Sequence, residues 1–221
     1  MPTLPSPLSA GRLTSTDADH CVRNVTQSPS LLGLFLFLGH NEFLNAKAEV
    51  TAEMPRDRIF LVGFMGSGKS TVGPLVAAQL EWDFIDLDRQ IEREQGKSIR
   101  EIFEYQGELE FRKIEVRHLR SLKDRTTCVV ALGGGTFVQE GNRPIVAELG
   151  VSVFLDCRLE VIRARCPSDG NRPLFATPEQ VKDLYAIRQP FYQMSDFSVD
   201  TSDIEPAKVA DLILQKVTQR K

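Results

Sequence analysis

The stretch Gly63-Phe64-Met65-Gly66-Ser67-Gly68-Lys69-Ser70 decides the fold of this chain, because it fits the phosphate-loop pattern G-x-x-x-x-G-K-[ST]. It follows the apolar run Arg58–Phe64, which is typical of a buried parallel strand, and it precedes a helix predicted over Lys69–Leu80. Strand, glycine loop and helix in this order form the context in which the pattern binds nucleotide phosphates.

The residue types in the loop explain how it can bind phosphate. Gly66 and Gly68 allow the backbone to curl so that successive N–H groups point at phosphate oxygens. The helix that follows adds about half a positive charge at its N-terminus. Lys69 supplies an ammonium group for the β- and γ-phosphates, and the Ser70 hydroxyl can ligate magnesium. We therefore expect a site for a nucleoside triphosphate and Mg²⁺.

Strands and helices alternate through the rest of the chain. Further strands are predicted at Asp83–Ile85, Thr127–Leu132, Val151–Leu155 and Phe197–Asp200. Further helices are predicted over Arg89–Glu94, from a capping box at Ser98 to about Gly107, over Glu108–Leu122 and over Pro206–Val217. This alternation predicts βαβ units, and so an α/β fold with a parallel sheet covered by helices on both faces.

The composition excludes several classes of protein. The 221 residues are 42% hydrophobic and 26% charged, with a formal net charge of −3, which argues against a nucleic-acid partner. The longest apolar run, Leu31–Leu38, is far shorter than the roughly 18–20 residues that span a membrane. Cys21, Cys128, Cys157 and Cys166 lack metal-site spacing, so we expect reduced thiols in a cytoplasmic protein without a membrane partner.

Residues 1–53 differ from the remainder of the chain. They are rich in Ser, Thr and Pro and show weak periodicity, which predicts an N-terminal extension of low order. Their three basic and five acidic residues do not fit a transit peptide, which is rich in Arg and poor in acids. Met54 stands four residues before Arg58, where the first predicted strand begins, so the extension is expected to be a mis-called start or a dispensable segment. Residues 54–221 would then hold the complete α/β domain.

Other motifs favour phosphoryl transfer to a small acceptor. A regulatory GTPase would need an Asn-Lys-x-Asp motif, which the sequence lacks. A motor or transporter ATPase would usually have an apolar strand that ends in Asp, but the strand at Thr127–Leu132 is followed by three glycines. The chain is also small for either class.

Asp86 and Asp88 follow the second predicted strand. In an extended backbone, residues i and i+2 point the same way, and ligands of open α/β sheets bind beyond the carboxyl ends of the strands. Asp86 could hold a magnesium-bound water, and Asp88 could accept a hydrogen bond or a proton from an acceptor hydroxyl. The alternative is two solvated acids that cap the helix over Arg89–Glu94.

Two arginines are candidates for binding a carboxylate. Arg112 and Glu115 share a helix face, so Glu115 can orient the Arg112 guanidinium for two parallel hydrogen bonds. The alternative is an exposed ion pair that contributes little energy. Arg188, in a helix that ends at Pro190, is either a second carboxylate clamp or a solvated charge.

Two loops complete the set of candidates. Gly133, Gly134 and Gly135 either let a ligand approach main-chain N–H groups closely or form a sharp turn with positive φ. Cys166–Pro178 has the composition of a mobile lid, in which Arg172 would fold onto the γ-phosphate like an arginine finger. The alternative for this segment is a plain surface loop.

In their order along the chain, these motifs resemble those of shikimate kinase. They are GFMGSGKST, DLD, EFRKIE, ALGGG, RPLF and Arg188-Gln189-Pro190-Phe191-Tyr192, and the similarity runs from about residue 57 to about residue 217. The resemblance implies a nucleoside-monophosphate-kinase-like fold with three α/β/α layers, a five-stranded parallel sheet in the order 2-3-1-4-5 and a mobile lid. It also implies ATP-dependent phosphorylation of the shikimate 3-hydroxyl in the pathway to chorismate and the aromatic amino acids.

Carried over by position, the resemblance implies a role for each site residue. The residues that would bind ATP are Gly66, Ser67, Gly68, Lys69, Ser70, Thr71, Arg165 and Arg172. Arg165 would lie against the adenine, with Pro206 as a weaker candidate for its other face. Those that would bind shikimate are Asp88, Arg112, Gly133, Gly134, Gly135 and Arg188. Catalysis would depend on Lys69, Asp88 and Arg172, with Mg²⁺ held by Ser70 and, through water, by Asp86. We expect a monomer.

Departures from the family pattern and competing functions remain. The lid reads RPLF where the family usually has RPLL, and Thr201–Glu205 lacks the basic residue often found near the nucleotide. A gluconate-kinase-like enzyme shares the loop and fold but would not require the arginines and the glycine triplet. A catalytically silent homologue would be expected to lose Lys69, Asp88 or Arg172, and all three are present. An ATPase without a small acceptor is the third alternative.

Overall fold

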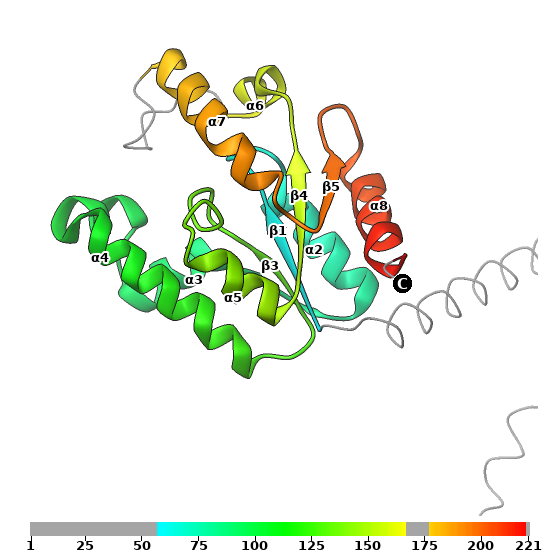
Figure 1. Cartoon of the computed structure of the whole chain (residues 1–221), viewed down its shortest axis with the longest axis horizontal. Helices are drawn as coiled ribbons and strands as arrows, with labels where there is room; N and C mark the ends of the chain where they lie inside the picture. Colours follow the sequence, from blue (N-terminus) through cyan, green and yellow to red (C-terminus); the bar gives the residue numbers. More distant parts are fainter. Residues whose placement is uncertain (1–56, 167–176, 220–221) are drawn as a thin grey trace, which may run out of the picture. The chain divides into compact units, whose positions relative to one another are not determined.

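A computed structural model describes residues 57–166 and 177–219 of the chain. In these residues, five strands form one parallel sheet with the order β2-β3-β1-β4-β5 (Figure 1). The strands are β1 (Arg58–Val62), β2 (Asp83–Asp86), β3 (Cys128–Ala131), β4 (Val151–Asp156) and β5 (Phe197–Asp200). This is the predicted strand order.

Helices cover both faces of the sheet. They are α2 (Lys69–Leu80), α3 (Leu87–Gln95), α4 (Ile99–Ser121), α5 (Asn142–Leu149), α6 (Leu159–Arg165), α7 (Pro178–Tyr192) and α8 (Pro206–Thr218). Helices α2 and α8 pack on one face, while α3, α4, α5 and α7 lie over the other (Figure 1). The predicted three-layer α/β/α architecture is therefore confirmed.

The alternating side chains of β1 supply both halves of the core. Ile59 and Leu61 pack toward α2 and α8, whereas Phe60 and Val62 pack toward the opposite helices. All four are at most 1% exposed. Because both faces of a central parallel strand are buried, its sequence is a continuous apolar run and not an alternating one.

The element boundaries follow local signals in the sequence. Strand β1 ends at Val62, two residues before the predicted end, because Gly63 leaves the extended region with φ 144°. Helix α4 has the predicted capping box, in which Ser98 Oγ accepts from the Glu101 N–H and Glu101 Oε2 accepts from the Ser98 N–H. Gly107, with φ 79° and ψ 168°, interrupts α4 at the predicted break. Helix α5 was not predicted.

Some predictions fall on residues that the structure does not describe. These are the low-order extension at residues 1–53 and the central part of the loop from Cys166 to Pro178, including Arg172. The two helices that flank the loop, α6 and α7, are both present. Among the described residues, no helix combines the length and apolar character needed to span a membrane. Cys128 and Cys157 are buried in the core, and both have free thiols, as does Cys166.

Candidate active site

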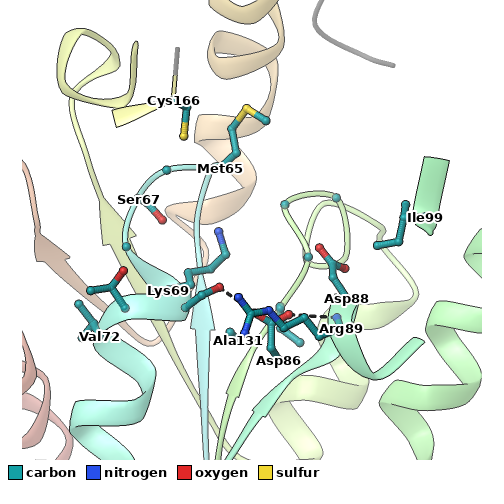
Figure 2. Close-up of a pocket in the computed structure, with 18 of the residues that line it drawn as sticks. Met65, Ser67, Lys69, Val72, Asp86, Asp88, Arg89, Ile99, Ala131 and Cys166 are labelled. Carbon is teal, nitrogen blue, oxygen red and sulfur yellow. Dashed lines mark hydrogen bonds between the residues drawn. The ribbon is translucent and has the colours of Figure 1, made fainter. Parts of the chain in front are cut away.

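A cavity of about 820 Å³ opens beyond the carboxyl ends of β1, β2 and β3. Lys69 at the start of α2 and Asp88 at the start of α3 both reach into it (Figure 2). Its lining includes these residues singled out from the sequence: Gly66, Ser67, Gly68, Lys69, Ser70, Thr71, Asp86, Asp88, Arg112, Gly133, Gly134, Gly135, Arg165, Arg188 and Pro206. Arg172 lies outside the described residues, so its place and its role stay predictions.

The glycines of the phosphate loop have conformations that other residues rarely adopt. Gly66 has φ 70° and Gly68 has φ 103°. A Cβ atom on Gly66 would also lie 2.8 Å from Cys166 Sγ, so space as well as backbone conformation excludes a side chain there. Thr201 Oγ1, just after β5, donates to the Ser67 carbonyl at 3.0 Å and holds the loop against the sheet. The loop therefore has the curled backbone that the phosphate-loop pattern predicts.

Lys69 extends back across the loop. Its Nζ donates to the carbonyl oxygens of Gly63 at 2.7 Å and Phe64 at 2.8 Å. These contacts hold the ammonium group beside the N-terminus of α2, where a backbone cradle and the helix dipole already favour an anion. Phosphate oxygens that entered the loop would find this positive charge in place.

Ser70 and Asp86 bring two oxygen ligands together. Ser70 Oγ donates to Asp86 Oδ2 at 2.7 Å, while Asp86 Oδ1 accepts from the Arg89 N–H and caps α3 (Figure 2). The helix-capping alternative is therefore correct for Asp86, although its second oxygen faces Ser70. Hydroxyl and carboxylate oxygens suit Mg²⁺, which keeps most of its remaining ligands as phosphate and water. The described residues contain no larger cluster of acidic, His or Cys ligands, so the pair fits magnesium held together with a nucleotide.

The Asp88 side chain points into the cavity, but from a helix and not from the extended backbone that was predicted. It belongs to the first turn of α3 and not to an extended strand, so the i, i+2 argument for its direction was wrong. The solvated-acid alternative was wrong as well. Burial, followed by the neighbouring carboxylates of Glu115 and Asp86, raises the pKa of Asp88 to about 6, against the opposing effect of Lys69. A carboxyl with this pKa is poised to exchange a proton near neutral pH.

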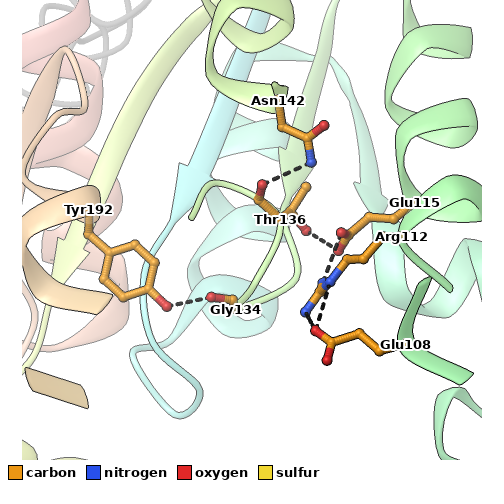
Figure 3. A network of polar contacts seen from close by, with 7 residues as sticks. All are labelled: Glu108, Arg112, Glu115, Gly134, Thr136, Asn142 and Tyr192. Atoms are coloured by element: carbon orange, nitrogen blue, oxygen red, sulfur yellow. Dashed lines mark hydrogen bonds and ion pairs between the residues drawn. The ribbon is translucent and has the colours of Figure 1, made fainter. Parts of the chain in front are cut away.

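Arg112 is held by two carboxylates of unequal exposure. Its Nη1 donates to Glu115 Oε2 at 2.9 Å and its Nη2 to Glu108 Oε1 at 3.0 Å (Figure 3). The Glu115 side chain is only 1% exposed, whereas that of Glu108 is 60% exposed. The exposed-ion-pair alternative is therefore wrong, because the partner that orients Arg112 is buried.

Arg188 lies across the cavity on α7. Its guanidinium carbon is 5.9 Å from the centre of the Phe64 ring. Tyr192, one turn further along α7, is 1% exposed and donates its hydroxyl to the Gly134 carbonyl at 2.5 Å. Burial raises the pKa of this hydroxyl to about 12, and the nearby Arg188 opposes that rise. Arg188 therefore lines the cavity, and its role as a carboxylate clamp stays a prediction.

The glycine triplet has a role that neither alternative anticipated. The segment does turn, since the Thr136 N–H donates to the Gly133 carbonyl at 3.1 Å. None of the three glycines has a positive φ, however, so that part of the sharp-turn alternative was wrong. Each leaves room for a different polar side chain instead. An added Cβ would lie 2.5 Å from Asp88 Oδ1 at Gly133, 3.3 Å from Arg188 Nη1 at Gly134 and 2.7 Å from Arg112 Nη2 at Gly135. The triplet therefore lets one acid and two guanidinium groups converge.

The nucleotide side of the cavity includes Arg165. Its Nη2 donates to the carbonyl oxygens of Thr201 at 2.8 Å and Ser202 at 3.0 Å, which places the guanidinium between the phosphate loop and the segment after β5. Pro206, at the start of α8, lines the same cavity. A stacking role for either residue against adenine stays a prediction.

Sequence reasoning missed several residues of the lining. They include Met65, Glu92, Ile99, Phe103, Phe111 and Cys166. Phe103 and Phe111 pack against each other with ring centres 4.7 Å apart and form part of an apolar wall. Apolar residues at helical spacing are the ordinary signature of a core-facing stripe, so nothing in their pattern marked them as cavity residues.

The fold and the site define a class of protein. A phosphate loop on a parallel sheet, next to a cavity with one raised-pKa acid and two guanidinium groups, is the arrangement of a P-loop kinase for a small acceptor. A family model described as shikimate kinase matches residues 65–218. The chain belongs to the shikimate kinase family.

Individual relatives agree with the family model. The chain is 38% identical over 160 residues to a shikimate kinase of Persephonella marina, an alignment that covers 72% of this chain and 98% of that protein. A shikimate kinase structure from Acinetobacter baumannii in complex with shikimate is 36% identical, with a TM-score of 0.72, and covers 78% and 98% of the two chains. The shikimate kinase of Aquifex aeolicus is also 36% identical, with a TM-score of 0.66 and coverage of 72% and 95%.

Proposed function

We propose that this chain transfers the γ-phosphoryl group of ATP to the 3-hydroxyl of shikimate, giving shikimate 3-phosphate and ADP on the route to chorismate. The observation that carries the proposal is the convergence of Asp88, Arg112 and Arg188 on the glycine triplet, in the same cavity as the phosphate loop. Shikimate has a carboxylate and three hydroxyls, so it calls for cations at one end and an acid at the other. Guanidinium groups bind carboxylates through paired hydrogen bonds, and the Asp88 carboxylate can accept from a hydroxyl.

In this mechanism, the protein mainly positions groups and neutralises charge. Lys69 exchanges its contacts with the loop carbonyls for phosphate oxygens and stabilises the charge that develops on them. Ser70, and Asp86 through water, would hold Mg²⁺, which supplies further neutralisation of phosphate charge when bound. Asp88, ionised above its pKa of about 6, orients the acceptor hydroxyl and accepts its proton. Arg172 is proposed to close onto the γ-phosphate.

A coupled assay of ADP release tests the proposal directly. The full chain is incubated with ATP and Mg²⁺, and shikimate, quinate and gluconate are offered in separate reactions. We expect ADP release with shikimate, with mass spectrometry showing one added phosphate on shikimate. Gluconate-dependent release would replace the proposal with the gluconate-kinase alternative. Release without any acceptor would indicate an ATPase, and tight ATP binding without turnover would indicate the silent homologue.

Two substitutions test the proposed roles within the cavity. Asp88→Asn should lower kcat much more than it weakens shikimate binding if Asp88 accepts the proton, whereas equal losses would leave it an orienting role alone. Arg112→Lys should mainly raise KM for shikimate, because Lys lacks the planar fork that makes two parallel hydrogen bonds. An unchanged KM for shikimate would show that Arg112 does not take part in binding it.

We also propose that residues 54–221 form the catalytic unit, since the family match at 65–218 lies inside them. The protein is proposed to act as a monomer in the cytoplasm. A chain that starts at Met54 should keep the kcat of the full chain, and light scattering should give the mass of one copy. Loss of activity on truncation would assign a catalytic or stabilising role to the extension.

A further inference from the structure

A chain of hydrogen bonds connects Arg112, in the lining of the cavity, to the buried side chains of Glu115 and Thr136. The Glu115 carboxylate lies in its middle: Oε2 accepts from Arg112 Nη1 at 2.9 Å, and Oε1 accepts from Thr136 Oγ1 at 2.6 Å (Figure 3). Thr136 is fully buried and Glu115 is 1% exposed. The hydroxyl and the guanidinium therefore hold opposite oxygens of one carboxylate that is shielded from water.

Thr136 is itself held at both ends of its backbone. Its N–H donates to the Gly133 carbonyl at 3.1 Å, and its own carbonyl accepts from Asn142 Nδ2 at 2.9 Å (Figure 3). Asn142 is 1% exposed and is the first residue of α5. Thr136 also directly follows Gly135, where the missing Cβ makes room for the Arg112 guanidinium. The position of the hydroxyl is thus set by the same loop that sets the space for Arg112.

We infer that Thr136 is a positioning residue for the binding of the substrate carboxylate, acting on Arg112 through Glu115. This inference rests on the proposed function, in which Arg112 binds the carboxylate of shikimate. A buried carboxylate oxygen without a donor is unfavourable, so Glu115 would turn both oxygens toward Arg112 if the hydroxyl were removed. The Arg112 guanidinium would move with the Glu115 carboxylate and would no longer be aligned with the carboxylate of shikimate.

The exposed partner of Arg112 cannot take over this role. The Glu108 side chain is 60% exposed, and water competes for both of its oxygens. To make two parallel hydrogen bonds, an arginine needs its guanidinium plane held at a defined position and orientation. A solvated glutamate fixes neither of these. Arg112 therefore depends on the buried side of its network for its orientation.

Steady-state kinetics of full-length Thr136 variants test the inference. Thr136→Val keeps the shape and removes the hydroxyl, and Thr136→Ser keeps the hydroxyl and removes the methyl group. We expect Thr136→Val to raise KM for shikimate about tenfold, while kcat and KM for ATP stay within about twofold. Thr136→Ser should stay within about twofold of the wild type in all three constants.

Thr201 provides a matched control on the other side of the cavity. It is also a buried threonine, 2% exposed, and its hydroxyl donates to the Ser67 carbonyl in the phosphate loop. Thr201→Val should raise KM for ATP more than KM for shikimate, which is the reverse of the pattern expected for Thr136→Val. If both Val variants shift the two KM values alike, the hydroxyls have only a general structural role and the inference is wrong.

Other outcomes also overturn the inference. It fails if Thr136→Val leaves KM for shikimate within about twofold of the wild type, or if Thr136→Ser is damaged as much as Thr136→Val. If Thr136→Val does not fold, Thr136→Ala replaces it, and the Ser and Ala variants then differ by the hydroxyl alone. A wild-type chain that is inactive with shikimate refutes the proposed function and this inference together. An active wild type with insensitive variants refutes the inference only.

Discussion

Asp88 should destabilise the ligand-free protein at neutral pH, and Asp88→Asn should relieve that effect. The ordinary pKa of the group is 3.8, and in the folded chain it is about 6. Between these values the folded state binds more protons than the unfolded state, so the free energy of unfolding decreases as pH rises through this window. The destabilisation is complete above pH 6 and small below pH 4.

The size of the effect follows from the two pKa values. The rise from 3.8 to about 6 is a little over two units, which at about 1.4 kcal/mol per unit gives about 3 kcal/mol at pH 7.5. At pH 5, where the folded group is mostly protonated, about half of this remains. Asparagine has nearly the same shape and no charge to desolvate. For a domain of this size, the melting temperature at pH 7.5 should rise by about 6–12 °C.

Urea unfolding of the full chain without ligands measures the difference. Wild type, Asp88→Asn and the control Asp83→Asn, which changes an exposed aspartate at the start of β2, are compared at pH 5 and pH 7.5. The increase in the free energy of unfolding caused by Asp88→Asn should be larger at pH 7.5 than at pH 5. The effect of the control substitution should not depend on pH. A gain that does not increase with pH, or a loss at pH 7.5, would refute the reasoning. If Asp88→Asn stabilises the protein as expected and also lowers kcat, the cavity gives up stability in return for activity.

Three further outcomes are expected. The kcat/KM for shikimate should fall about tenfold per pH unit below pH 6, because Asp88 becomes protonated, and a pH–rate profile flat down to pH 5 would contradict this. Gly135→Ala should raise KM for shikimate at least about tenfold, since its Cβ would lie 2.7 Å from Arg112 Nη2, and an unchanged KM in steady-state kinetics would contradict that contact. Gly73→Ala should lower the free energy of unfolding by about 1–3 kcal/mol in urea, because its Cβ would lie 2.2 Å from the Phe84 ring, and equal stability would show that the ring can move away.

The parts of the fold that depend on local sequence were predictable. The phosphate loop, the continuous apolar run of β1 and the capping box at Ser98 each act within a few residues, and the structure contains all three. The strand order depends on contacts between distant segments. It could be predicted only because the set of motifs resembled a known family.

The environment of the charged side chains was less predictable. The spacing of Arg112 and Glu115 shows that they share a helix face, but spacing does not say whether that face meets solvent. The answer depends on Thr136, which lies 21 residues after Glu115 and covers its carboxylate. The predicted direction of the Asp88 side chain was wrong for a related reason. Helix α3 begins at Leu87, so the directions of the following side chains are set by the helical repeat and not by the alternation of a strand.

The glycine triplet shows why such a site is difficult to predict from sequence. Strand β3 lies between β2 and β1, so its carboxyl end meets segments that arrive from α3, α4 and α7. Each segment brings one polar side chain to one glycine, and the backbone of the triplet sets the spacing between the three. A Cβ atom at any of these positions would crowd a different one of the proposed substrate-binding groups, so a sequence of three glycines specifies three contacts at once. The requirement for glycine therefore lies in side chains that are distant in sequence: Asp88 is 45 residues before Gly133, Arg112 is 23 residues before Gly135 and Arg188 is 54 residues after Gly134. Only the folded chain shows it.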